Sequence, residues 1–158
     1  MDTSPAGYAT TLIGPTGERN DYRLKPRQAV LCMARNPGDL LYQLATVLAV
    51  DGQALWIASP ALAPLYQQLP PAMQAHVRFI HDMSDAPWDA VLMHGSATDI
   101  IEMNEYLAER PGAIILMQAL PTGWRQPGAF SLTGLLKEQS VSINTAAAGG
   151  NASLMTLG

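Results

Sequence analysis

The sequence predicts an α/β fold: a Rossmann-like, mainly parallel sheet with flanking helices, followed by a terminal strand and an extended C-terminal tail. Three observations lead to this class. Short apolar runs typical of buried strands recur along the chain, segments with helical periodicity separate them, and capping residues mark several of the junctions. Strands that alternate with helices favour right-handed crossovers, and 158 residues suffice for one ordinary domain.

The first strand and helix are predicted in residues 28–52. The run QAVLCMAR (28–35) is a buried strand. Asn36 is placed to cap the following helix, Pro37 suits its first position, and Asp39 puts a carboxylate near unpaired backbone donors. Apolar residues then recur at helical spacing until the Asp-Gly pair at 51–52, which ends the helix.

Two further strands follow. Residues 54–59 (ALWIAS) and 77–82 (VRFIHD) have the composition of strands. Between them, residues 60–76 predict one or two helical turns, which we expect Pro64, Pro70 and Pro71 to break.

The clearest strand is WDAVLMHG (88–95). The sequence SATD, from Ser96 to Asp99, is a capping box, and Ile100, Met103 and Leu107 then define one helical face. The helix should end at residues 110–112, and residues 113–120 (AIILMQAL) predict another buried strand.

The pattern changes after Leu120. Residues 121–128 (PTGWRQPG) are a loop, residues 132–139 (LTGLLKEQ) predict a short amphipathic helix, and residues 140–144 (SVSIN) alternate like a single exposed strand that needs an edge to pair with. We therefore divide the chain into an extended arm or linker (1–27), a Rossmann-like domain (28–139), and a terminal strand with an uncharged tail (140–158).

The composition excludes some functions. Hydrophobic residues make up 48% and charged residues 14%, so an unusual share of the surface must be neutral or covered by a partner. A net charge of −4 and scattered basic residues argue against nucleic acid. The single cysteine, Cys32, favours a reduced, cytoplasmic location, and no run is long enough to span a membrane.

No catalytic or cofactor motif is complete. Gly95 and Ser96 occupy the expected place for a phosphate-binding turn, but the turn has one glycine and a nearby Asp99, so a helix cap is the better interpretation. The histidines (His76, His81, His94) lack metal-ligand spacing, and Cys32 lies in a buried strand. Asp82, Asp85 and Asp89 are interpreted as a solvated acidic edge rather than an acid/base cluster.

The tail is the most informative segment for function, because no residue after Glu138 is charged. Small neutral side chains are cheap to dehydrate, and Leu154, Met155 and Leu157 offer anchors. We therefore predict that it docks on a partner, and that in the isolated chain much of it after Asn144 is disordered or lies on a neighbouring molecule. A flexible tail on its own core remains the alternative. The predicted partner-binding residues are Ser142, Asn144, Thr145, Gly149, Gly150, Asn151, Leu154 and Met155.

Residues 14–27 (GPTGERNDYRLKPR) and 140–158 (SVSINTAAAGGNASLMTLG) resemble the C-terminal domain of long proline utilization A proteins, as do LLYQLATVLAVDGQALW and WDAVLMHG. These proteins are bifunctional: a flavoenzyme module oxidises proline, and an NAD-dependent aldehyde dehydrogenase module oxidises glutamate semialdehyde. The resemblance implies a domain of the aldehyde dehydrogenase superfamily without catalytic residues. It would pack on the aldehyde dehydrogenase module and help to lid the cavity through which the intermediate passes.

The resemblance also implies that FAD and NAD belong to the parent enzyme, with no cofactor for this domain, and that a homo-oligomer is possible. The start at Met1 is more consistent with an excised segment than with a whole natural protein. Two alternatives remain open. One is an independent NAD-binding, dehydrogenase-like domain that uses the turn at Gly95, and the other is a dimerisation module.

Overall fold

A computed structural model describes residues 5–145 of the chain. Five parallel strands form the central sheet, in the spatial order β5-β4-β3-β6-β7. Their bounds are β3 Val30–Met33, β4 Ala54–Ile57, β5 Val77–Ile80, β6 Ala90–Gly95 and β7 Leu116–Pro121. The chain runs outward from β3 to β5 and then restarts beside β3 with β6, so the strand order reverses between β3 and β6. The α/β class is therefore confirmed.

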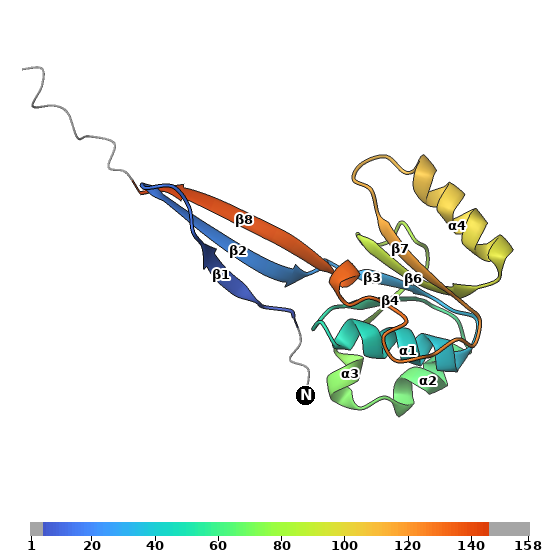
Figure 1. The fold of residues 1–158 in the computed structure, drawn as a ribbon. Coiled ribbons are helices and arrows are strands. Elements are labelled where there is room, and N and C mark those ends of the chain that lie inside the picture. Colours follow the sequence, from blue (N-terminus) through green and yellow to red (C-terminus); the bar gives the residue numbers. More distant parts are fainter. Residues whose placement is uncertain (1–4, 146–158) are drawn as a thin grey trace, which may run out of the picture.

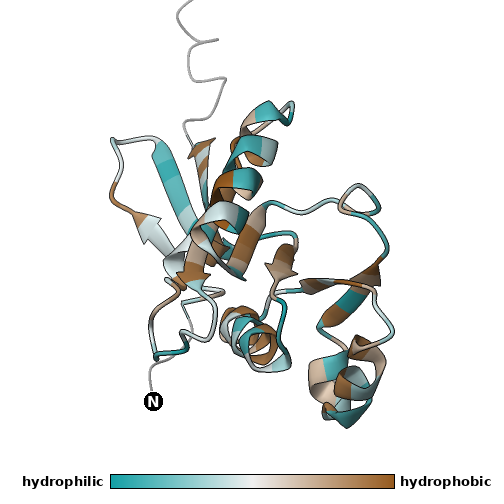
Figure 2. Cartoon of the chain, turned by 90° about the vertical axis from the view of Figure 1, so that its right-hand side faces the viewer, coloured by the Kyte–Doolittle hydropathy of each residue, from teal (hydrophilic) through white to brown (hydrophobic). Residues whose placement is uncertain are grey.

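Helices cover both faces of this sheet (Figure 1). Successive residues of each strand point to opposite faces of the sheet, and they contribute to two separate hydrophobic cores. On one face Cys32, Trp56 and Leu92 pack with α1 (Pro37–Leu48) and α2 (Leu62–Gln68), and the short α3 (Pro71–Gln74) follows α2. On the other face Leu55 and Val91 pack with α4 (Ala97–Glu109). Figure 2 shows hydrophobic colour on the central strands and both colours on the helices, as expected for helices with one buried face.

Both predicted helix starts are confirmed. The Asn36 side chain accepts a hydrogen bond from the Asp39 backbone N–H, Pro37 opens α1, and Ser96 and Asp99 form a reciprocal capping box on α4. Pro64, in contrast, does not break a helix. It is the third residue of α2, where the missing N–H has no intrahelical acceptor in any case.

Two predictions after residue 112 are wrong. Residues 113–120 are not a buried strand, because β7 lies at the edge of the sheet and the two ends of the strand are exposed. Residues 132–139 are not an amphipathic helix. Only a 3₁₀ turn forms, η1 (Thr133–Leu135), and the chain continues directly as strand β8 (Leu136–Asn144).

A second, antiparallel sheet in the order β1-β2-β8 is built from both ends of the described chain. Strands β1 (Ala9–Leu12) and β2 (Glu18–Pro26) lie within the segment that we assigned to an arm or linker. Strand β8 pairs with β2 over nine residues, so the predicted exposed strand finds its partner inside the same chain. We call this three-stranded sheet the arm. It projects away from the central sheet (Figure 1).

The base of the arm is tied to the central domain by a few polar contacts. Arg27 donates hydrogen bonds to the carbonyls of Gly134 at 2.7 Å and Asp89 at 3.1 Å. Lys137 forms an ion pair with the Asp89 carboxylate. No helix in the described residues is both long and apolar enough to cross a membrane.

Candidate functional site

The carboxyl ends of β3 and β6, where the strand order reverses, are the usual ligand position in an open α/β sheet. The N-termini of α1 and α4 both point to this region, and helix N-termini attract phosphate groups. The groups that lie at this crevice decide whether a phosphate could bind there.

Asp99 occupies the N-terminus of α4. Its Oδ2 accepts hydrogen bonds from the Ser96 N–H at 2.8 Å and from the Ser96 hydroxyl at 2.7 Å. Its Oδ1 lies 2.6 Å from the Arg35 guanidinium. The hydrogen bonds from Ser96, followed by that from Arg35, lower the pKa of Asp99 to about 2. A fixed negative charge therefore stands where a phosphate would bind.

Gly95 is explained by the same cap. A Cβ atom at this position would lie 2.9 Å from the Cβ of Asp99 and 3.2 Å from the end of Met93. The missing side chain therefore lets Asp99 fold back over the turn. The predicted turn at Gly95 and Ser96 is in the expected place, and its described contacts are those of a helix cap.

The ionisation of Asp99 should make the free energy of unfolding depend on pH. Because the folded pKa of Asp99 lies below its ordinary value of 3.8, its stabilising effect is present above pH about 4 and is lost as the pH falls towards 2. Asp99→Asn should therefore lose less stability than the parent chain between pH 4 and pH 2 in urea unfolding. Parallel stability curves for the two proteins would contradict this assignment.

Asp39 occupies the N-terminus of α1 in a similar way. It is fully buried, and its Oδ2 accepts a hydrogen bond from the Gly123 N–H at 2.9 Å. Arg125 forms an ion pair with Oδ1, 3.5 Å away, without a hydrogen bond. Gly123 and Arg125 belong to the loop after β7, so the carboxylate holds that loop against the helix.

The same loop, residues 121–128, also contacts His94 at the end of β6. The Trp124 carbonyl can only accept, so His94 Nε2 donates to it at 2.9 Å, and Nδ1 accepts from the Gln43 amide at 2.9 Å. These two contacts set the orientation of the imidazole ring. The Tyr42 hydroxyl donates to the Gln126 carbonyl. The chain's own loop thus lies over part of the crevice.

The remaining candidate residues do not come together. The Cys32 thiol is buried, and desolvation strongly raises its pKa, which disfavours the nucleophilic thiolate. His76 contacts the Gly52 carbonyl, away from His94. Within residues 5–145, no three His, Cys, Asp or Glu side chains are grouped as metal ligands.

The three acidic residues near β5 have separate structural contacts. Asp85 accepts hydrogen bonds from the backbone N–H groups of His81 and Asp82, and Asp82 accepts two from Ser84, which lower its pKa. Asp89 instead pairs with Lys137 at the base of the arm. Two of the carboxylates therefore hold a turn, and the third anchors the arm.

The predicted partner-binding residues within the description lie at the outer end of β8. The Ser142 hydroxyl donates to the Asn20 side chain, Asn144 is opposite Glu18, and the Thr145 N–H donates to the Gly17 carbonyl at 2.8 Å. Gly149, Gly150, Asn151, Leu154 and Met155, and the predicted disorder after Asn144, lie outside the described residues.

The arm has an open edge along β8. In an antiparallel pair of strands, every second residue is hydrogen-bonded to the residue opposite it. The Thr145 N–H donates to the Gly17 carbonyl and the Arg27 N–H to the Leu135 carbonyl, so the odd-numbered residues of β8 are the ones bonded to β2. Ser140 and Ser142 fall between these pairs, so their backbone groups face away from β2. In the described part of the chain, β8 has no second neighbouring strand.

Both faces of the arm are also largely exposed. Tyr8, Leu12, Val141 and Ile143 expose between 40% and 54% of their surface, and eight of the nine residues of β8 are exposed. By the strand register, Ile143 and Val141 share a face with Arg19 and Arg23. A three-stranded sheet without a buried face has little to stabilise it alone, so this arm is suited to a partner. Sequence reasoning found β8 but missed β1 and β2, because their polar residues show no buried face.

The chain is similar to bifunctional proteins named PutA. It is 45% identical to the protein of Salmonella typhimurium and 41% identical to that of Escherichia coli, over 99% of this chain in both cases, and 38% identical to that of Rhizobium meliloti over the same share. It spans only 12–13% of the length of these relatives. The chain is therefore homologous to one segment of much longer proteins. No protein-family model matches it.

Solved structures support the fold. A structure of proline utilization A with proline bound in remote sites matches 72% of this chain and 14% of its own, with a TM-score of 0.51 and 20% identity. A variant of the protein from Bradyrhizobium japonicum gives the same coverage and TM-score. At this level of identity the likeness concerns the fold alone.

Proposed function

We propose that this chain is a non-catalytic accessory domain of a bifunctional proline-catabolic enzyme in the cytoplasm. It docks through the arm and the uncharged tail on the aldehyde dehydrogenase module of the same polypeptide and helps to close the cavity that holds the intermediate. FAD and NAD serve the catalytic modules. The sequence similarity to PutA proteins supports this proposal, and the proposal adds a role for the matching segment.

One observation carries the proposal: the arm exposes both of its faces and the outer edge of β8, with backbone donors and acceptors at Ser140 and Ser142 directed outward. A strand of another module added at this edge would satisfy those groups. On the face of Val141 and Ile143, Arg19 is already paired with Asp21, so the face favours a partner surface that is mainly apolar.

The crevice supports the non-catalytic part of the proposal. Asp39 and Asp99 place carboxylates at both helix N-termini, and residues 121–128 contact His94 and Asp39. A dinucleotide would have to displace the loop and bring its phosphates against two negative charges. This arrangement is unfavourable for the alternative of an independent NAD-binding domain.

Ser140→Pro tests the docking edge. It removes an N–H that faces outward, so the hydrogen bonds between β8 and β2 remain possible. In the bifunctional enzyme we expect NADH formation from proline to fall roughly fivefold to tenfold. The reason is that the proline removes one hydrogen bond to the partner strand and its ring clashes with that strand. Proline oxidation measured with an artificial electron acceptor should be unchanged.

Ser140→Ala is the matched control, because it keeps the backbone N–H and should behave like the parent enzyme. Circular dichroism of the 158-residue chain carrying Ser140→Pro checks that the arm still forms. A folded Ser140→Pro enzyme with unaltered coupled turnover would show that the edge of β8 is not a docking site.

A further inference from the structure

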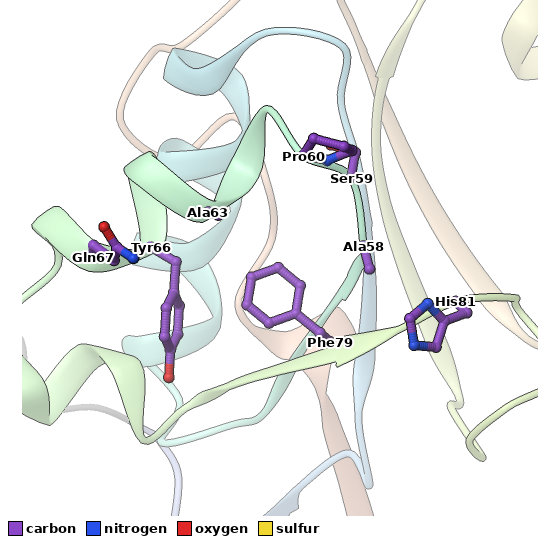
Figure 3. A pocket seen from close by; sticks show the side chains of 8 residues that line it. All are labelled: Ala58, Ser59, Pro60, Ala63, Tyr66, Gln67, Phe79 and His81. Atoms are coloured by element: carbon purple, nitrogen blue, oxygen red, sulfur yellow. The ribbon is translucent and has the colours of Figure 1, made fainter.

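One hollow in the described residues lies at the carboxyl ends of β4 and β5, away from the arm. It has a volume of about 420 Å³ and opens between α2 and the edge strand β5 (Figure 3). Its residues come from the carboxyl ends of β4 and β5 and from the exposed side of α2. The docking role proposed above uses none of them.

The hollow has an aromatic wall. Phe79 of the edge strand β5 is 37% exposed, which leaves part of its ring open to the hollow. The Tyr66 ring lies edge-to-face with it at a centroid distance of 5.2 Å, and the buried Trp56 ring supports it from behind at 6.1 Å. Ala58, Pro60 and Ala63 complete the apolar lining. Such a wall suits a flat ring, which can contact the open part of Phe79.

Three polar side chains stand around this wall on different sides: Ser59 and Gln67 near the helix, and His81 beyond β5 (Figure 3). None of the three side chains has a hydrogen-bond partner among the residues that the structure describes. Ser59 and His81 offer a hydroxyl and an imidazole at the rim of the hollow, whereas Gln67 lies on the far side of Tyr66 from Phe79 (Figure 3). An apolar hollow with a few polar groups at its rim is a common form of small-molecule site.

The absence of charged residues from the lining limits the kind of ligand that the hollow could bind. No Lys, Arg, Asp or Glu lines the hollow. A phosphate or carboxylate would therefore lose hydration without an opposite charge in return, whereas a neutral ring with donors and acceptors at its edge would keep its hydrogen bonds. We propose that this hollow binds a neutral, planar heteroaromatic molecule of nucleoside size.

Adenosine is the probe, titrated into the 158-residue chain and followed by calorimetry and by amide NMR shifts. We expect saturable binding that perturbs residues 58–67 and 79–81. Ala63→Trp fills the hollow from an exposed helix position and should abolish binding while the chain stays folded. Phe79→Ala should weaken binding roughly ten- to hundredfold, as for the loss of a stacking ring.

Ile114→Ala is the matched control, because Ile114 is an equally apolar residue, 98% exposed, beside the opposite edge strand β7. It should bind adenosine like the parent chain. Absence of saturation at millimolar adenosine, or an unchanged affinity in Ala63→Trp, would overturn the proposal. Binding of NAD that survives Ala63→Trp would assign the ligand to the turn at Gly95 instead, and would count against this site and against a crevice unsuited to NAD.

Discussion

Removing residues 144–158 from the proposed bifunctional enzyme should lower NADH formation from proline by roughly tenfold or more, with proline oxidation nearly unchanged. The deleted segment carries no charge, and Leu154, Met155 and Leu157 would each contribute about 1.5–3 kcal/mol if fully buried in a partner module. Losing two such anchors is enough for the expected effect, even after the cost of ordering the segment.

The measurement compares two rates in one protein: proline-dependent reduction of an artificial acceptor and proline-dependent formation of NADH. A substitution control, Leu154→Asp with Met155→Asp, keeps the length of the chain but places charges that are costly to bury. It should reproduce the deletion. If both variants retain the coupled rate of the parent enzyme, the uncharged tail has no part in docking or in closing the cavity.

Replacing Asp39 by alanine should lower the free energy of unfolding of the chain by about 2–3 kcal/mol. This carboxylate is fully buried and serves three groups: the Asn36 amide, the Gly123 N–H and Arg125. Their loss removes the acceptor of the Asn36 amide and releases the loop after β7, while the backbone hydrogen bond to the Asn36 cap remains. Because Arg125 is half exposed and can regain hydration, the cost should stay below that of a fully buried ion pair.

Urea unfolding monitored by circular dichroism measures this difference. Asp39→Asn keeps an acceptor for Gly123 and should cost about half as much. Asp85→Ala is the matched control, because that carboxylate accepts two backbone hydrogen bonds in an exposed turn. An Asp39→Ala stability within about 0.5 kcal/mol of the parent would contradict the bridging role. In the proposed enzyme, the released loop would also uncover the crevice.

The elements that sequence predicted well depend on neighbours in the chain. Asn36 and Ser96 accept hydrogen bonds from backbone groups three residues later, so their helix starts are visible in four letters of sequence. The central strands are short apolar runs because both faces of the sheet are covered. The turn at Gly95 was also located from adjacent residues, because the apolar run of the strand before it stops at a glycine.

Errors arose where a distant segment decides the structure. Residues 132–139 contain Leu132, Leu135 and Leu136 at a spacing compatible with a helix, but pairing with β2 draws residues from Leu136 onward into a strand. Residues 113–120 are as apolar as the central strands, and only the strand order shows that β7 has a neighbour on one side alone. The contacts of Asp39 with Gly123 and Arg125 had no signal in sequence, because the loop belongs to the other end of the domain.

By itself, the sequence of this protein determined the alternation of strands and helices, the helix caps and the uncharged character of its last residues. These features follow from interactions within a few residues and from composition. Only the tertiary structure decided that the two ends of the domain join in an exposed arm, that a loop and two carboxylates lie at the crevice, and that a hollow opens beside β5. The physical reason is that such contacts unite residues far apart in the chain, and their free energy depends on which surfaces remain uncovered after the core has packed.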